Sequence, residues 1–312
     1  MNPGRGIGGV LKGVYIVLVT PFGSDGRVDL ESINKNVDWQ ISQGIDGVVA
    51  TGSTGEFVGL EDVEREQISE AVVRAAAGRV PVFIGTSAES TEKVIANSRL
   101  VKKMGADGVM VLPSYYCKPN QEEIYAHFAC IADSVDMPVI IYNNPGTTGV
   151  DIKAETAARM FRYSRNLATI KECTGDMRRI REIRLLIEDR MNVFCGWEDL
   201  AYESFVMGAR GWISVIGNVA PRMAKELFDL AYEQKDLGGA WKVYLKLLPM
   251  LGYLEYWGNA PQILKYCLGK MGLAGGPVRS PRLPLSDEQK RILDETCVLR
   301  GSSEFPREGA QV

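Results

Sequence analysis

The 312-residue chain is predicted to fold as an α/β protein, a (β/α)8 or TIM barrel with a C-terminal helical extension. Short β-branched apolar runs alternate with longer helical stretches from residue 15 to about residue 215, which is typical of parallel βαβ units. Eight such strands can be counted, and eight is the number that closes a barrel. A doubly wound open sheet is the structural competitor, but eight units without a break in composition favour closure.

Each predicted strand is an apolar run bounded by Gly, Pro or Asp. The eight strands are expected at residues 15–20, 47–51, 80–85, 108–112, 138–142, 168–172, 191–195 and 211–215. Several of the intervening stretches carry acidic residues in their first turn, as the helix dipole favours. These barrel helices are expected at residues 30–42, 61–77, 91–104, 121–134, 153–161, 177–188, 199–207 and 221–233.

The chain continues beyond the last barrel helix, and further helices are expected at residues 237–256, 260–270 and 286–298. Aromatic residues between Trp241 and Trp257 have helical spacing, which indicates packing between these helices. The predicted domain organisation is a catalytic barrel at residues 1–235 and a C-terminal helical extension at residues 236–300. Residues 301–312 are expected to form a disordered tail.

The composition is 46% hydrophobic and 24% charged, with a formal net charge of -3, which is ordinary for a soluble globular protein. Lys and Arg are scattered, so no nucleic-acid partner is expected. No run approaches the ~20 apolar residues that a membrane helix needs, so no membrane partner is expected either.

The six cysteines form no Cys-x-x-Cys pair, and His127 is the one histidine, so no metal site or disulfide framework is predicted. Reduced thiols and a cytoplasmic location are expected. Gly4, Gly6 and Gly9 match a dinucleotide fingerprint, but they follow no predicted strand. No cofactor is predicted.

In this fold the chemistry lies where strands end and the following loops begin. The second strand is followed by Thr-Gly-Ser-Thr-Gly-Glu, in which Gly52 and Gly55 let the backbone turn tightly. Exposed amides and the hydroxyls of Ser53 and Thr54 would form a cradle that suits a small carboxylate. A strand-to-helix turn with hydroxyl caps is the alternative, and this motif alone leaves both interpretations open.

Two neighbouring strands end in residues that suit proton transfer and nucleophilic attack. Tyr142 ends the fifth strand before an Asn-Pro-Gly turn, and alone it could transfer protons or be a rim aromatic. Lys171 ends the sixth strand, with Ile170 and Glu172 on the opposite face. A nucleophilic lysine must be uncharged, so we expect burial to lower its pKa from about 10.4.

The seventh strand is followed by Cys-Gly-Trp-Glu-Asp. Glu198 and Asp199, near Gly196, could bind substrate hydroxyls or simply begin a helix, since acidic residues favour a first turn. A lone strand-end lysine is usually a solvated rim residue, but motifs on several separate strand ends favour a site.

Five motifs of the chain, in order and nearly end to end, resemble the dihydrodipicolinate synthase and N-acetylneuraminate lyase family of Schiff-base-forming class I aldolases. They lie at residues 19–22, 52–56, 113–116, 142–145 and 170–172. The resemblance implies a (β/α)8 barrel with a helical extension, often assembled as a tetramer from tight dimers. It also implies a Schiff base between a lysine and the keto group of pyruvate or a 2-oxo acid.

The resemblance implies a role for each matching residue. Lys171 looks like the Schiff-base lysine, and Tyr142 looks like the proton donor and acceptor beside it. Ser53 and Thr54 resemble the pair that holds the oxo-acid carboxylate and relays protons. Tyr116 resembles the tyrosine that completes a neighbouring subunit's site.

The remaining expected substrate contacts are Gly52, Ile213, Thr147, Gly196 and Glu198. Of these, Ile213 lies where an apolar residue of the family backs the pyruvyl group. No metal ligand is expected. Thr147 stands where the synthases carry an arginine for the carboxylate of the aldehyde substrate. A bidentate charged contact of that kind contributes on the order of 1.5–3 kcal/mol, so an inefficient lysine-pathway synthase is predicted.

The acidic pair after Gly196 is nearer to the sugar-acid lyases. However, Val215 stands where they place a hydroxyl, and Cys173 stands where they have threonine. The aldehyde half of the pocket therefore matches neither prototype.

The leading function is a lyase or aldolase that forms an imine with pyruvate or a 2-oxo acid and makes or breaks an adjacent C–C bond with an aldehyde. One alternative keeps the imine but dehydrates or deaminates a 2-oxo-3-deoxy acid or a hydroxylated cyclic imine. Another is a non-catalytic oxo-acid binding protein. A homotetramer, built as a dimer of dimers, is the expected assembly.

Overall fold

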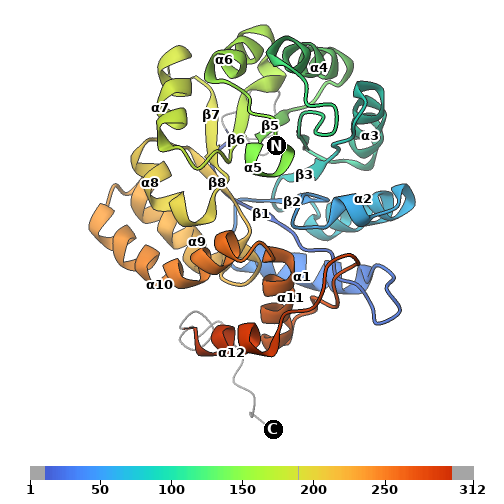
Figure 1. Cartoon of the computed structure of the whole chain (residues 1–312), viewed down its shortest axis with the longest axis vertical. Coiled ribbons are helices and arrows are strands. Elements are labelled where there is room, and N and C mark those ends of the chain that lie inside the picture. The colour runs from blue at the N-terminus through green and yellow to red at the C-terminus, as the bar shows by residue number, and fades with distance from the viewer. Residues whose placement is uncertain (1–10, 189, 297–312) are drawn as a thin grey trace.

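The computed structural model describes residues 11–188 and 190–296, and its strands close into a parallel barrel in the order β1 to β8. The predicted TIM barrel is therefore confirmed. The strands lie at the centre of the molecule with the helices around them (Figure 1). Their bounds are β1 Gly13–Val17, β2 Gly47–Ala50, β3 Val82–Gly85, β4 Gly108–Val111, β5 Val139–Asn143, β6 Thr169–Glu172, β7 Asn192–Cys195 and β8 Gly211–Ser214.

The barrel helices lie within a few residues of their predicted positions. Their bounds are α1 Leu30–Ser42, α2 Asp62–Ala76, α3 Thr91–Met104, α4 Gln121–Ser134, α6 Ala154–Tyr163, α7 Met177–Leu186, α8 Ala201–Val206 and α9 Pro221–Phe228. The segment expected as one helix at residues 221–233 changes to a π-helical turn, η5, at Asp229–Glu233. The Asn-Pro-Gly turn contains a short helix, α5, at Pro145–Thr148, because Pro145 suits a first helical position.

Up to residue 296, where the description ends, three helices follow the barrel, as predicted: α10 Leu237–Tyr256, α11 Ala260–Lys270 and α12 Asp287–Glu295. In Figure 1, α10 packs beside α9, and it also contacts α11. Helix α12 lies beyond α11 and is joined to it by the bond from the Tyr266 hydroxyl to Asp294. Residues 301–312, predicted to be a disordered tail, lie outside the described residues, as does Cys297. The domain boundaries stay a prediction. Within the described chain, no helix is both long and apolar enough to cross a membrane.

Aromatic rings fill the amino-terminal half of the barrel. Tyr15 lies edge-on against Phe83 and Phe194, with ring centroids 5.8 and 5.6 Å apart. Each ring lies over a glycine that begins a strand; a Cβ on Gly47 or Gly211 would lie 2.3 Å from a ring atom of Tyr15 or Phe194. These rings plug one end of the barrel, so the carboxyl ends of the strands are left for a site.

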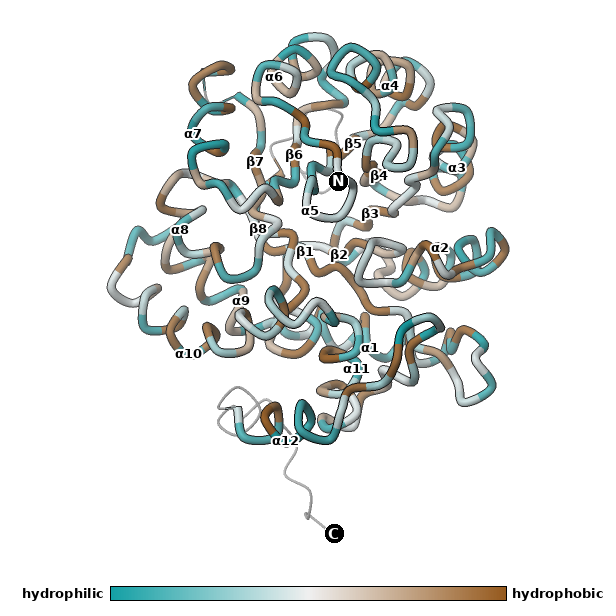
Figure 2. The backbone as a smooth tube through the Cα atoms, in the orientation of Figure 1, coloured by the Kyte–Doolittle hydropathy of each residue, from teal (hydrophilic) through white to brown (hydrophobic). Residues whose placement is uncertain are grey.

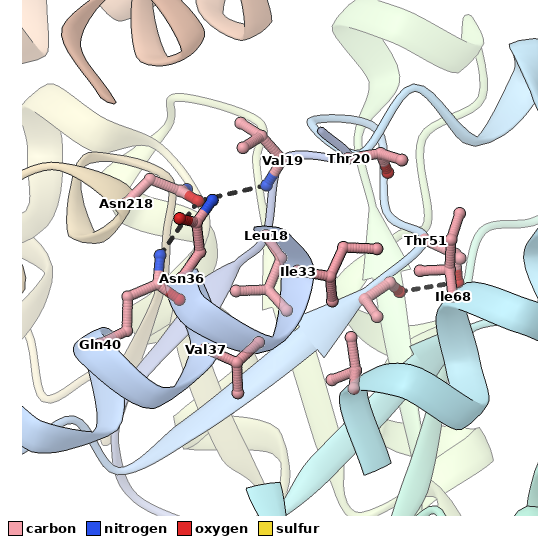
Figure 3. A pocket seen from close by; sticks show the side chains of 12 residues that line it. Leu18, Val19, Thr20, Ile33, Asn36, Val37, Gln40, Thr51, Ile68 and Asn218 are labelled. Atoms are coloured by element: carbon pink, nitrogen blue, oxygen red, sulfur yellow. Dashed lines mark hydrogen bonds between the residues drawn. The ribbon is translucent and has the colours of Figure 1, made fainter. Parts of the chain in front are cut away.

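A second, larger core joins the outer faces of the strands to the helices, and Figure 2 shows hydrophobic strands surrounded by helices with hydrophilic stretches. A small cavity of about 10 Å³ lies within this layer, between α1, α2 and the strands (Figure 3). It is lined by apolar residues and by the buried amides of Gln40 and Asn218, which are 3.3 Å apart. It has room for about one water molecule and is too small for an organic substrate.

Candidate active site

Lys171 and Tyr142 face each other at the carboxyl ends of β6 and β5. The strand register pairs them directly, and the Lys171 Nζ lies 4.4 Å from the centre of the Tyr142 ring. Lys171 is only 4% exposed and Tyr142 only 5%. Cys173, two residues beyond Lys171, lies in the same buried cluster of the barrel interior as Tyr142. The structure therefore brings the predicted nucleophile and the predicted proton-transfer group into contact.

Strand alternation sends the neighbours of this pair to the outside, as expected from the sequence. Glu172 pairs in register with Asn143, and its carboxylate accepts hydrogen bonds from Asn143 Nδ2 at 3.1 Å and from the Thr174 amide at 2.7 Å. Asn143 Nδ2 also donates to Asp151 at 3.1 Å. These bonds fix β5 against β6 outside the barrel, where a slip of one residue would separate Tyr142 from Lys171.

Gly196 leaves room for the side chains of Lys171 and Cys173, because it has no Cβ. A Cβ at this position would lie 2.1 Å from Cys173 Sγ and 2.7 Å from Lys171 Cε. Real Cβ atoms do not approach so closely, so the absence of a side chain lets the lysine cross the top of β7. Gly196 was predicted as a substrate contact, and the structure supports a steric role for it beside Lys171.

Residues 51–56 form a loop across the barrel mouth, named here the mouth loop. Its Gly52 approaches the interior so closely that a Cβ would lie 2.7 Å from Val17 Cγ1. Ser53 lies close enough to the phenol of Tyr142 to oppose the rise in its pKa. Thr54, the next residue, is buried. The mouth loop therefore brings Ser53, one of the predicted substrate-binding residues, close to Tyr142.

The phenol of Tyr142 is held in its neutral form. Burial raises its pKa, and this effect exceeds the opposing effects of Lys171, Asn144 and Ser53. The Asn144 contact is a 2.9 Å bond from Nδ2 to the phenol oxygen. A neutral phenol can donate a proton, and the amide donor would stabilise the phenolate that remains.

The pKa of Lys171 differs from the expectation. Burial is the largest influence and disfavours the ammonium, as predicted, whereas Tyr142, Cys173 and Glu198 favour the ammonium when they lose their own protons. The balance raises the pKa of Lys171 above its ordinary value, so the predicted net lowering is wrong, although burial itself acts in the predicted direction. At neutral pH this amine must lose a proton before it can attack a carbonyl.

Glu198 caps the backbone after β8. Its carboxylate accepts hydrogen bonds from the amides of Val215 at 2.8 Å and Ile216 at 2.9 Å. Burial raises its pKa to about 8. Asp199 is likewise engaged, because Tyr256 donates to its carboxylate at 2.5 Å. The acidic pair, for which both substrate binding and a helix start were expected as alternatives, is thus hydrogen-bonded within the protein and begins the short helix η3 at Glu198–Leu200.

Glu255 reaches the same region from α10, and its carboxylate accepts the Glu198 amide at 2.6 Å. Burial raises the pKa of Glu255 to about 7, while the charge of Lys171 opposes the shift. The sequence interpretation missed Glu255 because nothing near it in the chain marks it as a site residue. It also missed Asn144, which lies inside a recognised motif but was interpreted only as part of a turn.

The other predicted residues lie at different depths. Ile213 is fully buried in the barrel interior. Thr147 is exposed on α5. Tyr116 is 86% exposed on the loop after β4, and its amide donates to Glu89 at 3.2 Å. A single chain therefore leaves Tyr116 exposed on the surface, whereas Tyr142 is buried.

The remaining titratable groups give no sign of a metal centre. Among the described residues, no cluster of three or more His, Cys, Asp or Glu side chains could hold a metal ion. His127 lies on α4, where its Nδ1 is 2.9 Å from the Thr91 hydroxyl and burial lowers its pKa to about 4. It lies on a helix outside the barrel and not at a strand end, which agrees with a structural role.

Comparison with known proteins finds a matching family model and similar enzymes that share one name. A family model described as the dihydrodipicolinate synthetase family matches residues 10–298. The chain is 39% identical over 284 residues to the 4-hydroxy-tetrahydrodipicolinate synthase of Pelobacter propionicus. The alignment covers 91% of this chain and 97% of the relative. It is 37% identical over 285 residues to the enzyme of the same name from Bartonella bacilliformis, with 91% and 96% covered.

Solved structures of dihydrodipicolinate synthases also match this chain. The chloride-inhibited dihydrodipicolinate synthase of Acinetobacter baumannii, in complex with pyruvate, matches with a TM-score of 0.88 and 36% identity over 93% of this chain and 99% of that one. A structure described as the first monomeric dihydrodipicolinate synthase variant matches with a TM-score of 0.89 and 32% identity, covering 94% and 97% of the two chains.

Proposed function

Because the chain belongs to the dihydrodipicolinate synthetase family, as its sequence motifs indicated, we propose that this lyase of the class I aldolase type forms its Schiff base between Lys171 and pyruvate or another 2-oxo acid. The observation that carries the assignment is the direct pairing of Lys171 with Tyr142 inside the closed barrel, with Nζ 4.4 Å from the ring centre. The family consists of enzymes, so the alternative of a non-catalytic binding protein is set aside.

Imine formation needs an amine that has lost its proton and an acid for the keto oxygen. The nitrogen of Lys171 attacks the keto carbon, and the neutral phenol of Tyr142 gives its proton to the keto oxygen. The phenolate then takes a proton from the nitrogen and returns it to the hydroxyl, which leaves as water. The product is a protonated imine, with Tyr142 as the phenolate.

The imine makes the adjacent carbon acidic, and the Tyr142 phenolate removes its proton to give an enamine. The enamine carbon attacks the carbonyl carbon of an aldehyde, whose oxygen takes the proton back from Tyr142. Hydrolysis of the imine releases the product and Lys171. Ser53 and Thr54 hold the oxo-acid carboxylate, a role supported by their place on the mouth loop and by the proximity of Ser53 to Tyr142.

A second outcome uses the same imine without C–C bond chemistry: dehydration or deamination of a 2-oxo-3-deoxy acid or hydroxylated cyclic imine. It is favoured by Thr147, which lacks the charge that the synthases use for their aldehyde substrate. Product analysis by NMR separates the two. An aldolase yields or consumes a free aldehyde, whereas a dehydratase keeps the carbon skeleton intact and a deaminase releases ammonia.

We expect the condensation of pyruvate with aspartate semialdehyde to be slow, although the relatives from Pelobacter propionicus and Bartonella bacilliformis are named as synthases. Thr147 is exposed on α5 and cannot form a bidentate pair with the semialdehyde carboxylate. Thr147→Arg should therefore raise kcat/KM for the semialdehyde by about 10-fold or more, which corresponds to the lower part of the energy of a charged hydrogen bond. Coupled-assay kinetics with varied semialdehyde measure it.

Gly146→Arg is the matched control, because it adds the same charge one position earlier on an exposed turn of α5. It should leave kcat/KM unchanged. Efficient synthase kinetics in the unmodified protein would contradict the argument from Thr147 and require another cation for the carboxylate.

We expect the protein to assemble at least as a dimer and most readily as a homotetramer, with Tyr116 completing the site of a neighbouring chain. The support is its 86% exposure on the rim loop. Tyr116→Phe should lower kcat several-fold to about 10²-fold without dissociating the assembly, because only the hydroxyl is lost. Light scattering and steady-state kinetics on the same samples measure both effects.

Tyr163→Phe provides the control, since Tyr163 is an exposed tyrosine on α6 whose hydroxyl donates to Asp133 at 2.7 Å. It should change neither property. The family fold alone does not dictate assembly, given the monomeric synthase variant of the same fold. A fully active monomer would show that each barrel holds a whole site. The cytoplasmic location stays a prediction.

A further inference from the structure

A buried ion pair joins the C-terminal extension to the mouth loop. Lys265 on α11 lies with its Nζ 2.6 Å from Oε1 of Glu56, the last residue of the mouth loop, and the two side chains are 2% and 3% exposed. Residues of opposite charge are seldom buried to this extent, because both lose their hydration. The pair is more than two hundred residues apart in sequence, so it ties the end of the chain to the start of the barrel.

The surroundings of the pair hold each partner in place. The second carboxylate oxygen of Glu56 accepts the Arg279 amide at 3.1 Å. Lys265 donates to the Pro277 carbonyl at 2.8 Å and lies 4.1 Å from the centre of the Phe22 ring. Gly275 packs so tightly on Lys265 that a Cβ would lie 2.5 Å from its Cα. In Figure 1 this segment between α11 and α12 runs beside the first loop of the chain.

Glu56 is linked directly to the residues of the site. Its backbone is in the left-handed region, with φ of 57°, a conformation that few side chains other than glycine adopt without support. Its amide donates to the Ser53 carbonyl at 3.0 Å. The neighbouring Gly55 carbonyl accepts the Thr20 hydroxyl at 2.8 Å. Displacement of Glu56 would therefore move the segment that carries Ser53 and Thr54.

We propose that Lys265 and Glu56 are positioning residues, whose ion pair holds the mouth loop where Ser53 and Thr54 meet the substrate carboxylate and the phenol of Tyr142. This inference rests on the proposed function of the mouth loop. It assigns to the C-terminal extension a part in substrate binding. A pair kept only for stability could be replaced by uncharged side chains without effect on binding, since buried ion pairs rarely exceed well-packed uncharged ones in stability.

The test compares Lys265→Met, Glu56→Gln and the double variant with the unmodified protein. Each is incubated with a series of pyruvate concentrations, and the adduct trapped with borohydride is followed by intact-mass spectrometry. We expect the half-saturating pyruvate concentration to rise by roughly 10-fold or more in each single variant, with a smaller change in the maximal trapping rate. Misplacement of a binding group by about 1 Å costs on the order of 10²-fold in rate.

The double variant separates positioning from stability, because it buries no unpaired charge. Its melting temperature should recover relative to the single variants, while its half-saturating concentration stays raised. Glu56→Gln keeps the shape of the side chain and decides the question if Lys265→Met fails to fold. Lys270→Met is the matched control, since Lys270 lies on the same helix in an exposed pair with Asp294 and should leave the half-saturating concentration unchanged.

Recovery of both properties in the double variant, or an unchanged half-saturating concentration in the single variants, would overturn the inference. Adduct formation in the unmodified protein establishes the proposed function separately from these comparisons. An adduct that forms normally in every variant therefore contradicts only the positioning role, whereas no adduct in the unmodified protein contradicts the proposed function itself.

Discussion

Lys171→Met is expected to lower turnover by on the order of 10⁴-fold or more, because removing the nucleophile of a covalent mechanism removes every later step. Methionine fills the buried space that the lysine stem occupies, so the barrel should fold normally. Steady-state kinetics with the aldol or lyase substrate and circular dichroism measure the two effects. Comparable turnover in a folded Met variant would show that the reaction does not pass through this amine.

The pH dependence gives a second readout of Lys171. Because its pKa is raised, the fraction of neutral amine grows as the pH rises through the neutral range. The rate of imine formation should rise with it until another group limits the reaction. Rapid-mixing measurement of adduct formation at several pH values would reveal this slope, and a rate that falls over the same range would contradict it.

Tyr142→Phe is expected to slow turnover by roughly 10²–10⁴-fold, the range typical of losing a positioned acid–base group. The change removes the phenol that donates to the keto oxygen and leaves the Asn144 amide without its 2.9 Å partner. The ring stays, so the fold and the space around Lys171 should be preserved. Single-turnover kinetics should show slower imine formation, with the same adduct accumulating in the end.

Tyr15→Phe is the matched control for the tyrosine variant. Tyr15 is also buried in the barrel interior, but it packs against Phe83 and Phe194 in the amino-terminal half of the barrel. Burial and the carboxylates of Asp46 and Asp107 raise the pKa of its phenol. Its loss should leave kcat nearly unchanged. Equal effects in both variants would mean that the Tyr142 result reflects packing of the barrel rather than proton transfer.

Local patterns in the sequence predict much of the fold. Strand and helix positions follow from apolar periodicity, and the strand-end places of Tyr142 and Lys171 follow from the same runs. Period-two alternation also predicts that Glu172 points away from Lys171, as found. The direct pairing of Tyr142 with Lys171 could not be predicted, because register depends on contacts between β5 and β6 such as the bond from Asn143 to Glu172.

The parts of the site that the sequence did not reveal come from long-range packing. Glu255 and Lys265 belong to helices after the barrel, and each meets a strand-end loop far away in the chain. The predicted direction of the Lys171 pKa shift was wrong for the same reason. Burial could be inferred from the strand, but the acidic groups that favour its ammonium, Tyr142, Cys173 and Glu198, are brought together only by closure of the barrel.

The covalent adduct itself is the most direct test of the assigned mechanism. The protein is incubated with pyruvate, treated with borohydride and analysed by intact-mass spectrometry and peptide mapping. The proposed function predicts a single mass gain equal to pyruvic acid less one oxygen atom, located on Lys171 and absent from Lys171→Met. No mass gain with pyruvate or a panel of 2-oxo acids, or a gain that persists in Lys171→Met, would contradict it.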